Sequence, residues 1–147
     1  MAQCVPSEVA PIGSLLLKHP REAWRDRENI RRQWPALSYT GEPDLARACD
    51  EYEAFVGILR LSVPDVRFLP FSEGTGLDSI YVRDAACVAP RGVVLCRMGK
   101  ELRRSEPGAV REFCDRAGWP VVGEIREPGT LEGGDVVWLD ARTAAIG

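Results

Sequence analysis

The sequence contains a single histidine, His19, and no two cysteines in a Cys-x-x-Cys arrangement. Its cysteines are odd in number and widely spaced, so they indicate neither a disulfide framework nor a zinc site. We therefore expect no metal and no cofactor, and we interpret the cysteines as small, mostly buried hydrophobic residues. They are Cys4, Cys49, Cys87, Cys96 and Cys114.

The sequence also lacks a long apolar run and an excess of positive charge. No stretch approaches the roughly 20 apolar residues of a membrane span, and residues 1–11 lack the pattern of a signal peptide. The formal net charge of −3 gives no basic footprint for nucleic acid, although residues 21–32 are locally basic. We expect a soluble, cytoplasmic protein that binds neither membrane nor nucleic acid.

The composition is that of a folded domain. Hydrophobic residues make up 45% of the 147 residues and charged residues 28%, enough for one core of ordinary size. Apolar runs at residues 12–17 and 66–69 predict strands. The charged segment 21–34 predicts an exposed helix or an ordered loop. Helical spacing is clearest at Leu45, Cys49, Tyr52, Val56 and Leu59.

The second half of the chain repeats the order of elements found in the first. Residues 80–82, 86–89 and 93–96 predict a meander of short strands. A helix is predicted from Glu106 to a terminating Gly118, followed by strands at 121–125 and 136–139. The order helix, strand, acidic turn, strand thus occurs twice, which indicates a repeated supersecondary unit.

Four carboxylates lie in the two acidic turns that precede strands. They are Asp78 and Asp84 in the first turn, and Glu132 and Asp135 around a pair of glycines in the second. Carboxylates bind a guanidinium through paired, charge-assisted hydrogen bonds, so these turns indicate an arginine-like ligand. From spacing alone, the same acids could instead cap turns and satisfy NH groups at strand ends.

These motifs resemble those of the guanidino-group-modifying superfamily, and most closely its dimethylargininase and arginine deiminase branches. Its members are similar in an acid-Ser-x-x-x-x-Asp segment, as at residues 78–84, in a basic pair such as Arg103-Arg104 after a hairpin, and in an acid-Gly-Gly-Asp turn, as at residues 132–135. The resemblance implies an α+β, pentein-type β/α-propeller of repeated ββαβ units. Residues 1–147 would be the N-terminal part of this single domain and hold two to three units.

The resemblance also implies roles for the conspicuous charged residues. In that family a Cys attacks the guanidinium carbon and a His protonates the departing amine. Asp78 and Asp84 would hold the substrate's guanidinium or amino groups, and Arg103 would reach its carboxylate. Glu132 would be a catalytic residue that orients the guanidinium, and Asp135 is assigned to the same substrate-binding site.

The family's Cys and His positions fall beyond Gly147, and His19 does not match the acid. We therefore expect this chain alone to be inactive. The complete protein is predicted to be a dimethylargininase-like amidino hydrolase that converts methylated arginine to citrulline and an amine. Arg83, beside Asp84, is more typical of deiminase-like members and leaves the substrate open.

Two other functions stay open at this point. One is an arginine deiminase or amidinotransferase, and the other is a non-catalytic binding protein of the same fold. Converging carboxylates favour a small guanidino substrate as the partner. A second copy of the chain or a complementing C-terminal half are further candidate partners, because half a propeller would leave apolar edges uncovered.

Overall fold

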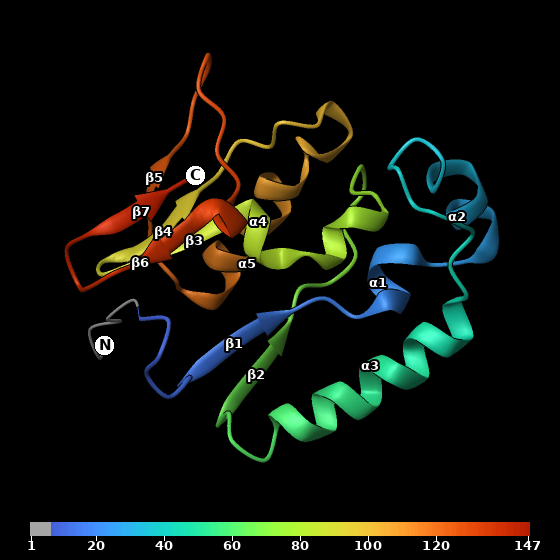
Figure 1. Cartoon of the computed structure of the whole chain (residues 1–147), viewed down its shortest axis with the longest axis horizontal. Helices are drawn as coiled ribbons and strands as arrows, with labels where there is room; N and C mark the ends of the chain where they lie inside the picture. The colour runs from blue at the N-terminus through green and yellow to red at the C-terminus, as the bar shows by residue number, and fades with distance from the viewer. Residues whose placement is uncertain (1–6) are drawn as a thin grey trace. The chain divides into compact units, whose positions relative to one another are not determined.

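The computed structural model of the chain describes residues 7–147, which form two compact units (Figure 1). One unit is Pro11–Tyr81, and the other is Val82–Gly147 together with the segment up to Ala10. Among the helices of the described residues, none has both the length and the apolar composition needed to cross a bilayer.

The unit Pro11–Tyr81 is a parallel pair of strands connected by helices. Ser14 is aligned with Asp65 and Leu17 with Phe68 in this pair, and helical connections are what parallel strands require. The elements are β1 (Ser14–Leu17), α1 (Pro20–Trp24), α2 (Arg27–Gln33), α3 (Leu45–Leu59), β2 (Asp65–Phe68) and the 3-10 helix η1 (Leu77–Ile80).

Side-chain caps begin the helices of this unit. The Asp26 and Asp44 carboxylates accept hydrogen bonds from backbone NH groups at the starts of α2 and α3, and the His19 imidazole does so for α1. In α3, Cys49 and Val56 are buried, which confirms the helix predicted from spacing.

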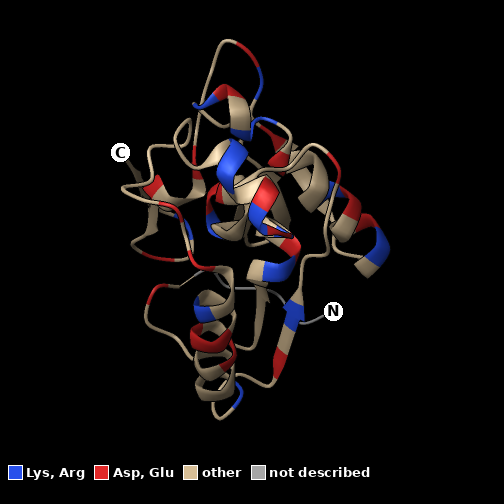
Figure 2. Ribbon diagram, turned by 90° about the vertical axis from the view of Figure 1, so that its right-hand side faces the viewer, with Lys and Arg blue, Asp and Glu red and all other residues tan. Residues whose placement is uncertain are grey.

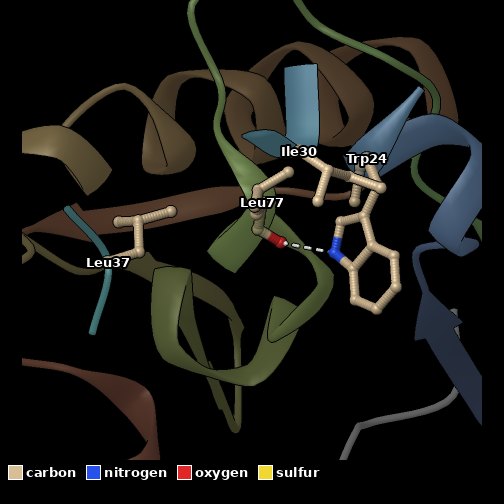
Figure 3. Close-up of a cluster of buried hydrophobic side chains, with 5 residues drawn as sticks. Trp24, Ile30, Leu37 and Leu77 are labelled. Carbon is tan, nitrogen blue, oxygen red and sulfur yellow. Dashed lines mark hydrogen bonds between the residues drawn. The ribbon is translucent and has the colours of Figure 1, made fainter. Parts of the chain in front are cut away.

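The core of this unit lies where the sequence predicted an exposed segment. Trp24, Ile30, Leu37 and Leu77 form a buried cluster, and the Trp24 Nε1 donates a 3.3 Å hydrogen bond to the Leu77 carbonyl (Figure 3). The prediction for residues 21–34 was therefore right about helix, as α1 and α2 show, but wrong in leaving the segment out of the core. Its few apolar side chains are enough because both helices are short. The buried residues are Pro20, Ala23 and Trp24 in α1 and Asn29 and Ile30 in α2.

The other unit contains a three-stranded sheet and a hairpin. Strand β4 pairs antiparallel with β3 and parallel with β5, while β6 and β7 pair antiparallel. Helix α5 contacts β4 and β5. The elements are α4 (Val82–Ala85), β3 (Ala86–Ala89), β4 (Gly92–Leu95), η2 (Glu101–Arg103), α5 (Glu106–Ala117), β5 (Val121–Glu124), η3 (Gly133–Asp135), β6 (Val136–Trp138) and β7 (Ala144–Ile146).

The predicted order of helix, strand, acidic turn and strand is present twice, as α3 to β3 and as α5 to β6. Helix α5 ends at Gly118, whose φ of 69° lies in the left-handed region, as predicted. Residues 80–82 do not form the predicted strand, because Ile80 ends η1, Val82 begins α4 and Tyr81 lies between them. Strand β7 was not predicted, since an Ala-Ala-Ile segment has little alternation and is paired only through β6.

Candidate functional site

Arg103 lies at the centre of the candidate site, in the unit that carries α4 to β7. It ends η2, directly before α5, and only 5% of its side chain is exposed. Its Nε and Nη2 atoms donate to Glu106 Oε1 and Oε2 at 2.9 and 2.8 Å. This two-point geometry fixes the plane of the guanidinium.

The opposite side of the guanidinium faces the two acidic turns. Arg103 Nη1 donates to Asp84 Oδ2 at 3.0 Å and lies 3.5 Å from Glu132 Oε2. Asp84 and Glu132 keep 22% and 29% of their side chains exposed. Two of the predicted site acids are therefore brought together, and both remain accessible from solvent.

Within residues 7–147, the Arg103 guanidinium contacts three carboxylates. They belong to Asp84, Glu106 and Glu132. Burial alone would lower the pKa of Arg103, but the hydrogen bonds and charges of Glu106 and Asp84 outweigh it and raise the pKa. Arg103 thus stays charged beside the two partly exposed acids.

The paired glycines of the second turn allow it to pack against α4, which carries Asp84. A Cβ at Gly133 would collide with the carbonyl oxygen of Arg83, and one at Gly134 would lie 2.6 Å from Asp84 Oδ1. The absence of side chains at these two positions is therefore what lets Glu132 lie beside Asp84.

Backbone contacts hold the turn of Glu132 in place. Arg97 and Leu131 exchange hydrogen bonds of 3.2 and 3.0 Å between their NH and CO groups. The NH of Gly99 donates to Glu132 Oε1 at 3.2 Å. Glu132 is thus oriented through both oxygens, one by Gly99 and the other by Arg103.

Asp78 and Asp135, the other predicted site acids, are placed differently. Asp78 belongs to the unit Pro11–Tyr81, is 4% exposed, and lies beside Tyr39. Burial and, after it, the charge of Asp78 raise the pKa of Tyr39. Asp135 is exposed, and within residues 7–147 its carboxylate makes no hydrogen bond or ion pair; its backbone carbonyl accepts from Gly147.

Arg83 has a structural role in its unit. Its Nη2 donates to the Val136 carbonyl at 3.0 Å and forms an ion pair with Glu8 at 3.2 Å. Glu8 also accepts a hydrogen bond from the NH of Trp138. The Arg83 guanidinium therefore joins α4, β6 and the segment before Ala10.

Sequence reasoning missed two groups that orient the site acids. Glu106 was interpreted only as a helix start, although the i,i+3 spacing from Arg103 is a signal for an ion pair. The contribution of Gly99 is a backbone NH, for which the residue type gives no signal.

Figure 2 shows acidic and basic residues interspersed along the ribbon. Within residues 7–147 no His, Cys, Asp or Glu cluster is suited to a metal ion.

Comparison with known proteins identifies relatives. No protein-family model matches the chain. It is 33% identical over 102 residues to the N(G),N(G)-dimethylarginine dimethylaminohydrolase of Pseudomonas aeruginosa, covering 69% of this chain and 40% of that enzyme. It is 43% identical over 60 residues to the Streptomyces coelicolor enzyme of the same name, covering 41% and 23%. The chain therefore spans less than half the length of these relatives.

Solved structures show the same likeness. The Pseudomonas aeruginosa enzyme in complex with citrulline has a TM-score of 0.70 at 28% identity, over 88% of this chain and 48% of that one. The N-terminal domain of ArgZ, a cyanobacterial arginine dihydrolase, has a TM-score of 0.66 at 16% identity, over 84% and 43%, which shows the fold alone. The resemblance to the guanidino-group-modifying superfamily is confirmed, and the α+β fold is part of the pentein fold.

Proposed function

We propose that this chain, which has the fold of the guanidino-group-modifying superfamily, supplies the guanidinium-binding acids of a dimethylargininase-like amidino hydrolase. The observation that carries the proposal is the cluster of Asp84 and Glu132 around Arg103, in which both carboxylates stay partly exposed. Relatives named dimethylarginine dimethylaminohydrolase, one of them seen with citrulline, support it. The reaction would convert methylated arginine to citrulline and an amine.

Asp84 and Glu132 are the residues proposed to hold the substrate's guanidinium. Both carboxylates are partly exposed beside the Arg103 guanidinium, so they can accept further hydrogen bonds from a second planar cation. Paired NH donors of the substrate would suit the carboxylate oxygens. Because both acids are fixed before the substrate arrives, little ordering is required on binding.

Glu132 is the proposed catalytic residue. The guanidinium carbon is a poor electrophile because its charge is delocalised. Carboxylates that align it for attack by a thiolate contribute orientation and electrostatic stabilisation. Only the resemblance predicts the Cys that would attack and the His that would protonate the amine. No cysteine among residues 7–147 matches the position of the attacking Cys in that family.

Arg103 is proposed to position the two acids. The sequence predicted instead that Arg103 reaches the substrate's carboxylate, but its contacts with Glu106 and Asp84 engage Nε, Nη1 and Nη2. To bind a substrate carboxylate, it would have to share or release these partners. Asp78 and Asp135 stay proposed substrate-binding residues. Neither belongs to the Arg103 cluster, so the cluster does not support their role.

The test is steady-state kinetics of Glu132→Gln and Asp84→Asn in the protein that carries this chain, with asymmetric dimethylarginine as substrate. Removing one partner of a charge pair costs on the order of 3 to 5 kcal/mol, so kcat/KM should fall about a hundredfold or more. The matched control is Glu112→Gln, an exposed Glu on α5, which should leave kcat/KM unchanged. Citrulline formation at the wild-type rate by Glu132→Gln would refute the proposal.

A further inference from the structure

Cys87 of β3 and Cys96, the residue that follows β4, lie in contact. The Sγ atoms of Cys87 and Cys96 are 3.6 Å apart. Cys87 is paired with Val94, and side chains two residues apart on a strand share a face, so Cys96 is the diagonal neighbour of Cys87 on that face. Cys49 and Cys114 are buried singly.

The two thiols differ in environment. Cys87 is half-buried, whereas Cys96 is 3% exposed and lines a surface pocket of 490 Å³ together with Arg97 and Arg104. The hydrogen bond with Cys96, aided by the charge of Arg83, lowers the pKa of Cys87 against the effect of burial. The same hydrogen bond, burial and the charges of Asp84 and Glu132 raise the pKa of Cys96. Cys87, the more exposed of the two, is therefore the thiol that a peroxide can reach first.

We propose that Cys87 and Cys96 are a redox modification site, which hydrogen peroxide oxidises to an intramolecular disulfide. The Cys87 thiolate attacks one peroxide oxygen, the O–O bond breaks, and a sulfenic acid and water form. The Cys96 sulfur then attacks the Cys87 sulfur, the S–O bond breaks, and its hydroxide leaves as a second water with the Cys96 proton. The two thiols together lose the two electrons that reduce the peroxide.

Closing this bond requires the end of β4 to move. The sulfur atoms must approach from 3.6 Å to about 2.0 Å. Diagonal neighbours in a sheet have Cα atoms about 7 Å apart or more, which is longer than most disulfides span. Cys96 follows the last residue of β4, and its NH donates a 3.0 Å hydrogen bond to the Ala85 carbonyl. Closing the disulfide would therefore shift this backbone contact together with the Cys96 side chain.

The movement would reach the acid cluster. Cys96 precedes Arg97, which is bonded to Leu131, and Gly99, whose NH orients Glu132. Drawing Cys96 toward β3 would shift both contacts and loosen Glu132. The link to substrate binding rests on the proposed function, whereas the disulfide itself does not.

The experiment reads only the covalent bond, so it is independent of the proposed function. The purified chain is treated with hydrogen peroxide near stoichiometry, alkylated, and digested with trypsin without reductant. Cleavage after Arg83, Arg91 and Arg97 places the two cysteines in separate peptides, residues 84–91 and 92–97. We expect these peptides to be joined, with a mass about 2 Da below their sum, and to separate on treatment with dithiothreitol.

Matched variants decide between this pair and the other cysteines. Cys96→Ser should abolish the linked peptide, and Cys114→Ser, which removes a singly buried thiol, should leave its yield unchanged. Linkage of Cys87 to Cys4, Cys49 or Cys114 would overturn the proposal. So would accumulation of Cys87 sulfinic acid with Cys96 still alkylated, because a resolving thiol in contact should prevent that oxidation.

Discussion

Glu106 holds the guanidinium of Arg103 by two hydrogen bonds of 2.9 and 2.8 Å, and both side chains are almost fully buried. The pair turns an arginine that could face a ligand into a fixed internal cation. Asp84 and Glu132 are then arranged around that cation, with part of each carboxylate left exposed. The Arg103–Glu106 pair thus fixes the guanidinium that Asp84 and Glu132 contact.

Glu106→Gln should therefore destabilise the unit that contains α5. It removes one partner of a buried ion pair, which costs about 3 kcal/mol or more in the free energy of unfolding. Urea denaturation followed by circular dichroism measures the loss. Glu112→Gln, on the exposed face of the same helix, should change it by less than about 0.5 kcal/mol. Equal stability of the two variants would contradict a structural role for the pair.

Arg103→Ala distinguishes the two roles considered for this arginine. If Arg103 positions Asp84 and Glu132, kcat/KM should fall by a similar factor, about a hundredfold, for an amino-acid guanidine and for its decarboxylated analogue. If it binds the substrate's carboxylate, the loss should be a rise in KM for the amino-acid substrate alone. Kinetics on arginine-type and agmatine-type substrates provide the comparison, and we expect similar losses on both.

Gly133→Ala should separate the acidic turn from α4. The added Cβ would collide with the backbone carbonyl of Arg83, which has no freedom to rotate away. We expect a loss of about 2 kcal/mol or more in the free energy of unfolding. The control is Gly108→Ala, where a Cβ at the start of α5 would meet open space. A Gly133→Ala variant as stable as the control would show that the turn can relax.

Stability should depend on pH through Glu8. Hydrogen bonds from Arg83 and the NH of Trp138 lower the pKa of Glu8 below its ordinary value of 4.5. A carboxyl group with a depressed pKa stabilises the folded state above its unfolded pKa, and this contribution is lost as the pH falls through the folded pKa. Wild type should exceed Glu8→Gln in melting temperature at pH 7, and the difference should vanish in acid. A difference that persists at pH 2 would contradict this account.

The sequence alone determined the features that depend on neighbouring residues. The spacing of apolar residues in α3, the Gly118 that ends α5, and the repeated order of elements are local patterns, and the structure has them. The resemblance of the turns at residues 78–84 and 132–135 was sufficient to indicate the family. These signals are reliable because helix periodicity and left-handed glycines act within one or two turns of chain.

Tertiary structure decided how the charged residues are used. Whether Arg103 faces a ligand or an internal acid depends on Asp84, which is 19 residues away, and on a buried Glu106. The glycines at 133 and 134 lie against α4, because added Cβ atoms there would meet Arg83 and Asp84. The residue type of a charged side chain does not show whether it binds a ligand or another residue of the protein. Only packing fixes its partner, because an ion pair needs two groups that the folded chain has already placed within about 4 Å.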